Sequence, residues 1–200
     1  MPVLQSAKRA GTPKQNETMN DDDKRMMAIL QNGNNGDHYP SPFVKLTDDE
    51  LDLAARIGTI RNETMNKMNL ASTNRNLPDK AFTEIMAVGA EIAVAKYLNL
   101  YFEYRLPLVP GSCDILSRDG RGIDVKFTKY RDGKLIVPDN KRNSCSLYVL
   151  VINPNGGSYF DIVGWTDSER LFHESNLAEM YGKMKYIMHQ IQLNPIHELL

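Results

Sequence analysis

The chain has 200 residues, of which 42% are hydrophobic and 24% are charged, the composition of an ordinary soluble protein. Its formal net charge is −1, so no global basic field indicates a nucleic-acid partner, and any such binding must come from a local patch. The sequence holds no run of about 18 apolar residues, which argues against a membrane-spanning helix, and its first residues lack the apolar segment of a secretory signal.

The first part of the chain is poor in core-forming residues. Residues 1–45 are rich in Asn, Asp, Gly, Pro and Lys and contain only one short apolar cluster. Such a segment cannot bury enough apolar surface to fold by itself. We therefore expect a flexible or loosely docked N-terminal arm over residues 1–45, followed by a single domain over residues 46–200.

Two helices are expected at the start of this domain. Thr47 followed by Glu50 has the spacing of a capping box, and apolar residues recur at helical intervals after it. A second helix is expected from about Pro78 to Leu98. Gly89 inside this helix indicates close packing against a neighbour, because Gly costs a helix about 1 kcal/mol relative to Ala.

After residue 100 the pattern changes to short runs of β-branched and aromatic residues separated by Gly, Asp and Asn turns. The expected strands are YFEYRLPLV, CDILSR, GIDVKFT, KLIVPD, LYVLVIN and YFDIVGW. LYVLVI is apolar on both faces and should be a central strand. Helical spacing returns over residues 168–180. This order predicts an α+β fold or a three-layer α/β/α sandwich with a central mixed β-sheet, and we adopt the sandwich.

Two cysteines, Cys113 and Cys145, are present, without the spacing of metal ligands. Both lie in apolar, strand-like contexts, so we expect buried free thiols rather than a disulfide. Free thiols predict a cytosolic protein.

The second helix carries two glutamates on its apolar stripe. Residues 84, 88, 91, 95 and 98 share one side of the helix and read Glu, Val, Glu, Ala, Leu. A buried carboxylate requires a cation, a donor or a cleft. Glu84 is expected at the edge of the stripe, where its carboxylate would reach solvent or an arginine. Glu91 is expected to belong to a functional site.

A hairpin over residues 113–127 places charge at a strand pair. Asp124 and Lys126 point to one face of their strand, and a turn near Gly120 sets Asp114 beside Asp124. Like charges opposite each other destabilise a sheet, and a hard divalent cation such as Mg²⁺ or Mn²⁺ between them would remove the repulsion. Lys126 could then orient an attacking water. The alternative is a surface hairpin with ordinary alternating charges.

The segments GAEIAVAKYL, CDIL and GIDVKFT, in this order and spacing, resemble the PD-(D/E)xK nuclease superfamily over roughly residues 80–165. The resemblance implies a restriction endonuclease-like fold, with Glu91 as the helix acid and Asp114 and Asp124 as metal ligands. It also implies Lys126 as the lysine near the nucleophile and the Val125 carbonyl as a further ligand. Cys113 stands where the family's motif has proline, a tolerant position.

A basic ridge follows the hairpin. Residues 126–142 carry six basic and two acidic side chains, a local balance of +4. A basic strand-and-loop segment beside a metal site suits a phosphate backbone, and its contacts would position the DNA rather than read its sequence. The expected nucleic-acid-binding residues are Lys129, Tyr130, Arg131, Lys134, Lys141 and Arg142. The alternative is a solvated hairpin in a near-neutral protein.

These observations together predict a Mg²⁺-dependent nuclease that hydrolyses phosphodiester bonds of DNA and, as the resemblance implies, leaves a 5′-phosphate. Mn²⁺ should substitute for Mg²⁺. A homodimer would suit cleavage of both strands, and the likeness to phage-type members implies the cytoplasm of a bacterial or phage-infected cell. The alternative is a catalytically inactive protein of this fold that binds DNA or a protein partner.

Overall fold

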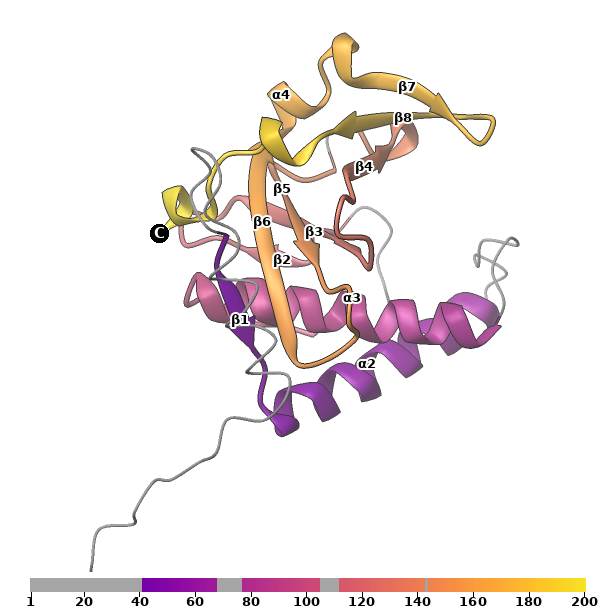
Figure 1. Ribbon diagram of the computed structural model, residues 1–200, viewed down its shortest axis with the longest axis vertical. Helices are drawn as coiled ribbons and strands as arrows, with labels where there is room; N and C mark the ends of the chain where they lie inside the picture. Colours follow the sequence, from indigo (N-terminus) through magenta and orange to yellow (C-terminus); the bar gives the residue numbers. More distant parts are fainter. Residues whose placement is uncertain (1–40, 68–76, 105–111, 143) are drawn as a thin grey trace, which may run out of the picture. The chain divides into compact units, whose positions relative to one another are not determined.

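The computed structural model describes residues 41–67, 77–104, 112–142 and 144–200. These residues form two β-sheets, two long helices and several short ones (Figure 1). The strands are β1 (Phe43–Lys45), β2 (Ile115–Leu116), β3 (Gly122–Thr128), β4 (Leu135–Pro138), β5 (Leu147–Ile152), β6 (Tyr159–Asp167), β7 (Leu177–Met180) and β8 (Lys183–Met188). The α-helices are α2 (Asp48–Lys67), α3 (Leu77–Tyr97) and α4 (Ser168–Leu171), and the 3₁₀ helices are η1 (Asp139–Lys141), η2 (Glu174–Asn176), η3 (Gln190–Gln192) and η4 (Ile196–Leu199).

The larger sheet, sheet A, is mixed and has the strand order β1-β6-β5-β3-β2. β3 and β5 are parallel, and the other neighbouring pairs are antiparallel. β5 is the middle strand, and all six of its residues are buried, as its two-sided apolar run predicted. The mixed α/β class expected from the sequence is therefore confirmed.

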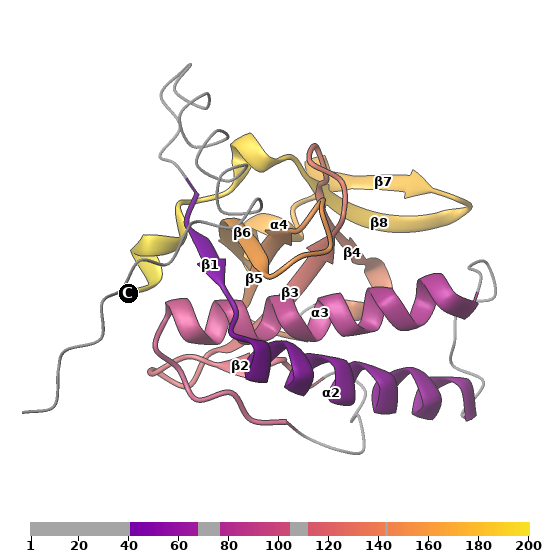
Figure 2. The same cartoon turned by 60° about the horizontal axis from the view of Figure 1, so that its bottom comes forward.

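The two long helices lie on one side of sheet A (Figure 2). The predicted capping box is present at the start of α2, where Thr47 N donates to Glu50 Oε2 at 2.7 Å and Glu50 N donates to Thr47 Oγ1 at 3.2 Å. Gly89 of α3 is also explained, because a Cβ there would lie 2.5 Å from Cζ of Phe160 on β6. None of the helices in the described part of the chain has the length and hydrophobicity to cross a membrane.

The other side of sheet A is covered differently from what we expected. A three-stranded sheet, sheet B, with the order β4-β8-β7 lies there together with the short α4. Its buried side chains, including Leu135 and Tyr186, form a second core with Tyr148 and Leu150 of β5. The α/β/α sandwich predicted a second layer of helices on this side of sheet A, and the structure has sheet B there instead.

The prediction of a helix over residues 168–180 is wrong beyond the first turn, because only Ser168–Leu171 are α-helical. α4 is a single turn whose first residues are capped by Asp167, with Arg170 N donating to Asp167 Oδ1 at 2.7 Å. The chain then forms β7, which pairs antiparallel with β8. The apolar spacing in this segment comes from a turn followed by a strand, and the strand depends on a partner that follows it in the sequence.

Two expected boundaries also differ. Phe43–Lys45, at the end of the expected arm, form β1 and pair antiparallel with β6, so sheet A begins before Leu46. Residues 1–40 of the arm lie outside the described residues. In the strand expected over 101–109, residues 101–104 are not in a strand, and 105–109 lie outside the described part.

We predict that Gly58→Ala destabilises the protein. A Cβ at Gly58 of α2 would lie 2.5 Å from Ile85 Cα and 2.6 Å from Ile85 N on α3, and backbone atoms cannot move aside as a side chain can. The free energy of unfolding should fall by about 1–3 kcal/mol in denaturant titrations. The exposed neighbour Thr59→Ala should change it by less than about 0.5 kcal/mol. A more stable Gly58→Ala, as helix propensity alone predicts, would contradict the close packing.

Candidate active site

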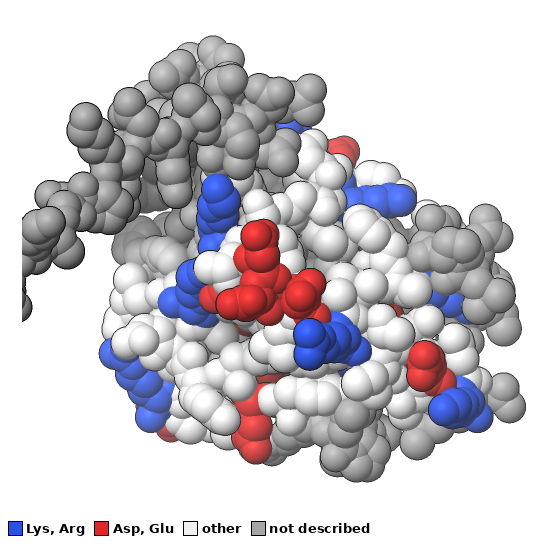
Figure 3. Space-filling view, turned by 90° about the horizontal axis from the view of Figure 1, so that it is seen from below, with Lys and Arg blue, Asp and Glu red and all other residues white. Residues whose placement is uncertain are grey.

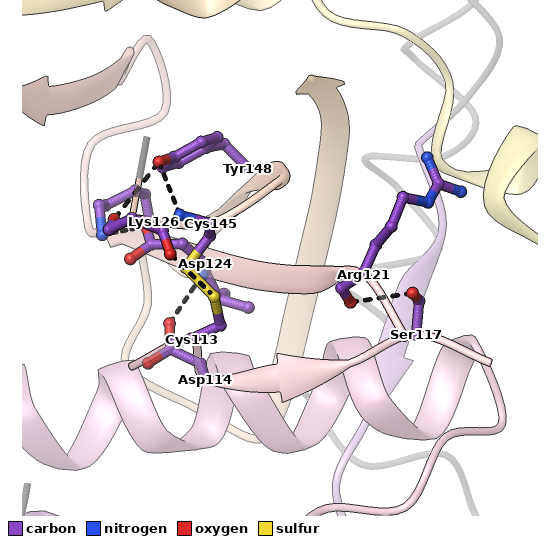
Figure 4. The surroundings of a disulfide bond; sticks show 10 residues. Cys113, Asp114, Ser117, Arg121, Asp124, Lys126, Cys145 and Tyr148 are labelled. Atoms are coloured by element: carbon purple, nitrogen blue, oxygen red, sulfur yellow. Dashed lines mark hydrogen bonds and ion pairs between the residues drawn. A yellow bond between two sulfur atoms is a disulfide. The ribbon is translucent and has the colours of Figure 1, made fainter. Parts of the chain in front are cut away.

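Asp114 immediately precedes β2, at the point where β3 continues beyond its pairing with β2. Ile115 and Leu116 pair with Ile123 and Gly122, and Asp114 N donates to Ile123 O at 2.9 Å, so Asp114 sits beside Asp124 as the hairpin predicted. Since β2 has only two residues, no strand of the described part of the chain pairs with β3 on this side beyond Ile123. Asp114 Oδ2 accepts a hydrogen bond from Val125 N at 2.8 Å (Figure 4).

Asp124 and Lys126 share the face of sheet A that is turned toward sheet B. The alternation of β3 puts Ile123 and Val125 into the core beneath α3, as predicted, and Asp124 on the opposite face. Asp124 is only 5% exposed and forms an ion pair with Lys126. Its register partner on β5 is Tyr148, which is fully buried. The acid and the lysine of the motif therefore contact each other directly.

Glu91 reaches the same region from the helix layer. It is 3% exposed and forms a bidentate ion pair with Arg61 of α2, in which Arg61 Nη2 donates to Glu91 Oε2 at 2.8 Å. Burial and the nearby charge of Asp114 raise the pKa of Glu91 from its ordinary 4.5 to about 7, although Arg61 opposes them. Glu84, by contrast, is half-buried, in keeping with its expected place at the edge of the stripe.

Asp114 interacts electrostatically with both of the other carboxylates, Asp124 and Glu91. Burial and the charge of Asp124 raise the pKa of Asp114, while the Val125 N–H, Lys126 and Arg61 lower it. Asp114 in turn raises the pKa of Glu91. Negative charge is thus concentrated here beyond what the two cations offset, and an additional cation would relieve it.

The donor set fits a hard divalent cation in its chemistry. Glu91, Asp114 and Asp124 supply carboxylate oxygens, the ligand type that such ions prefer. Within the described ranges, however, no three acidic, His or Cys side chains are already gathered tightly enough to hold an ion. Each acid instead contacts a cation or an N–H group. The Val125 carbonyl remains a predicted ligand.

Cys113 and Cys145 form a disulfide, so the expectation of two free thiols is wrong. Their Cα atoms are 5.7 Å apart, within the usual range for such a bond. The parallel pairing of β5 with β3 brings the two cysteines together, and Ser146 N donates to Gly122 O at 3.0 Å beside them. The bond ties the segment that carries Asp114 to the start of β5 (Figure 4). It also removes the argument from free thiols to a cytosolic compartment.

The six residues of the expected basic ridge are all exposed but fall into two groups. Lys129, Tyr130, Arg131 and Lys134 lie in the loop between β3 and β4. Lys141 and Arg142 lie in and after η1, at the other end of β4. Because β4 has four residues, the groups are separated by about 13 Å of strand.

A distant side chain fixes the first of these groups. Gln190 Nε2 donates to the carbonyl oxygens of Arg131 at 2.8 Å and Gly133 at 2.9 Å. Within the loop, Lys129 Nζ lies 5.8 Å from the ring centroid of Tyr130. The loop is therefore held in one shape by backbone contacts, and its basic side chains remain exposed.

Acidic residues that offset this basic charge occur on another element. The first turn of α2 carries Asp48, Asp49 and Glu50, where the helix dipole favours negative charge. Figure 3, seen from below, shows a cluster of acidic side chains on the face that α2 occupies. The near-neutral total thus hides a separation of charge between α2 and the loops around β4.

Sequence reasoning missed Arg61 and did not predict the contacts of Gln190. Arg61 could have been found, because it lies seven residues after Ala54 and four after Ile57, on the buried stripe of α2. An arginine on one apolar stripe and a glutamate on the next indicate a buried ion pair. Gln190 carries no such signal, since its two acceptors lie 59 and 57 residues earlier in the chain.

No protein-family model matches the chain, and no curated protein is significantly similar to it. The conclusions on function therefore depend on the geometry of the site and on the resemblance of its motif.

We predict that Asp114→Asn raises the melting temperature in the absence of divalent cations. Asparagine can still accept the hydrogen bond from Val125 N, while the repulsion from Asp124 and the cost of burying a charge disappear. A gain of about 1 kcal/mol in unfolding free energy is expected, and thermal unfolding in EDTA measures it. Asp119→Asn, on the exposed turn of the same hairpin, is the control and should not stabilise. A loss of stability in Asp114→Asn would show that the carboxylate is well compensated.

We also predict a pH dependence that originates at Glu91. Since its pKa in the folded protein is raised from 4.5 to about 7, the folded state binds this proton more tightly than the unfolded chain. The resulting stability is fully present below about pH 4.5 and is lost as pH rises to about 7. Denaturant titrations in EDTA should show this decline, by up to about 3 kcal/mol. Glu91→Gln should flatten it, whereas the exposed Glu63→Gln should leave it; an unchanged slope in Glu91→Gln would contradict the assignment.

Proposed function

We propose that the protein is a metal-dependent nuclease of the PD-(D/E)xK type, with a restriction endonuclease-like core and Mg²⁺ as its cofactor. One observation carries the proposal: the acid of the D-x-K strand, Asp124, raises the pKa of Asp114, and Asp114 raises the pKa of the helix acid Glu91. Folding has concentrated carboxylates where repulsion disfavours them. Groups with strongly perturbed pKa values cluster at functional sites.

The residues of the site divide the proposed reaction among them. Asp114 and Asp124 would hold the cation, with Glu91 directly or through water and the Val125 carbonyl as a further ligand. A bound Mg²⁺ would supply an activated water and offset charge on the scissile phosphate. Lys126, released from its ion pair with Asp124, would orient the attacking water from the same face of β3. In-line attack would release the 3′ oxygen and leave a 5′-phosphate.

DNA is the proposed substrate because exposed basic residues lie close to the site along the chain. The loop of Lys129, Tyr130, Arg131 and Lys134 begins three residues after Lys126 and is braced by Gln190. Such a loop can contact the phosphate backbone without reading bases. Lys141 and Arg142 lie at the other end of β4, which pairs with β8, and would contact further phosphates of the same DNA.

A second candidate is a protein of this fold that binds DNA or a protein partner without catalysis. The observation in its favour is that each acid already has a partner: Arg61 for Glu91, Lys126 for Asp124, and Val125 N for Asp114. In that case the charges form a structural network. Stability would then be indifferent to Mn²⁺ and Mg²⁺, whereas a nuclease site would be stabilised by them.

We predict that Asp124→Asn and Lys126→Met each lower cleavage by about 100-fold or more, since each removes a group that acts on the reacting phosphate or water. Plasmid, linear duplex, single-stranded and branched DNA should be tested with Mg²⁺ and with EDTA. Asp124→Asn should also lose the rise in melting temperature that Mn²⁺ gives the wild type. Asp132→Asn, on the exposed loop, should cleave normally. Undiminished cleavage in both site variants would refute the assignment.

A further inference from the structure

The β-hairpin of β7 and β8 belongs to sheet B, and its outer part extends beyond β4 as a two-stranded ribbon (Figure 1). β4 pairs with β8 only as far as Lys185, so no third strand from the described ranges lies beside the segment from Glu179 to Met184. Two residues, Tyr181 and Gly182, connect the strands, both with positive φ, at 55° and 71°. This is the backbone of a type I′ turn, which matches the twist of the strands. We call residues 177–188 the β7–β8 ribbon.

The tip of the ribbon carries a residue that the turn does not favour. The first position of a type I′ turn suits Asn, Asp or Gly, and an aromatic residue with positive φ is uncommon. Tyr181 occupies it and is 92% exposed, so burial of its ring does not compensate for the strain. Backbone strain of this kind is concentrated at sites of function. A contact between the ring and a binding partner would explain why tyrosine occupies this position.

One face of the ribbon is basic. Strand alternation and register place Lys183 and Lys185 on the same face as Ala178 and Met180, while Glu179 faces the other way. Lys185 Nζ lies 5.6 Å from the ring centroid of Tyr181, so the ring lies near the same face. Among the described residues of β4, β7 and β8, this face has no acidic side chain. An anionic partner would meet two ammonium groups and an aromatic ring there.

The base of the ribbon packs against the side of sheet A that bears the proposed site, through the face opposite to Lys183 and Lys185. Tyr148, the register partner of Asp124, packs edge-to-face on Phe172 with centroids 5.4 Å apart. Phe172 packs in the same manner on Tyr186 of β8 at 4.9 Å. Arg142 of the basic ridge lies 5.8 Å from the ring of Tyr186. Buried aromatic rings therefore connect the strand of Asp124 to the base of the ribbon.

We propose that the β7–β8 ribbon is a DNA-binding arm that contacts duplex DNA in a groove, with Tyr181 at its tip and Lys183 and Lys185 on the flanking phosphates. This inference rests on the proposed nuclease function and names how its substrate is held. A two-stranded ribbon has the width that the major groove admits, and lysines along one face suit the phosphate backbone. η1, with Lys141, follows β4 and contacts β8 at the base of the arm.

Tyr181→Asn is the decisive variant, because it separates folding from binding. Asparagine suits the turn better than tyrosine, so the melting temperature should stay the same or rise. Affinity for a 30-base-pair duplex, measured by fluorescence anisotropy in EDTA with the full chain, should fall several-fold. Unchanged affinity in a folded Tyr181→Asn protein would overturn the role of the tip.

The paired variant Lys183→Gln/Lys185→Gln tests the phosphate contacts. The slope of log affinity against log salt concentration should decrease in magnitude by about 2, since each phosphate contact contributes about 0.9. Arg56→Gln/Lys67→Gln, which removes two exposed charges from α2, should keep the wild-type slope. A loss of binding to single-stranded but not to duplex DNA in the ribbon variants would overturn the groove contact.

The two levels of proposal fail in different ways. If the wild type cleaves and binds duplex DNA while the ribbon variants bind as tightly as the control, the arm is refuted and the nuclease stands. If the wild type neither binds nor cleaves any DNA substrate, the nuclease proposal itself is refuted, and the arm with it.

Discussion

The repulsion among buried carboxylates at the open edge of β3 is the constraint on which the site depends. Asp114 lies between Glu91 and Asp124, and burial strengthens every interaction among them. A chain under selection for stability alone would replace such acids with apolar residues of similar size. Arg61 and Lys126 reduce the repulsion from the helix side and the sheet side respectively, but the pKa of Glu91 remains raised.

The fold creates this site by leaving one strand short. The two residues of β2 pair with the start of β3, and the remaining edge of β3 is open to the Asp114 side chain. The helix layer brings Glu91 to this edge, and sheet B encloses the face that carries Asp124 and Lys126. A disulfide fixes Cys113, the residue before Asp114, to the start of β5. Three separate layers of the protein therefore meet at one strand.

Local features of the sequence predicted local structure well. The capping box at Thr47 and the placing of Asp114 beside Asp124 depend on residues at most about ten positions apart, and the burial of Glu91 follows from the periodicity of its own helix. What the sequence did not predict depends on contacts between distant residues. β7 requires β8, and the disulfide joins cysteines 32 residues apart. Periodicity carries no information about such partners. The apolar spacing of a turn followed by a strand was therefore indistinguishable from that of a helix.

The ion pairs of the acids have a consequence for the order of events in the proposed nuclease. Arg61 and Lys126 hold Glu91 and Asp124 by charge, and a divalent cation that gathered these carboxylates would weaken both ion pairs. The released guanidinium and ammonium groups would be partly buried cations without their counter-ions, which is costly unless another anion replaces them. A DNA phosphate is such an anion. Cation and substrate would therefore favour each other's binding, and the carboxylates need not be gathered before both are present.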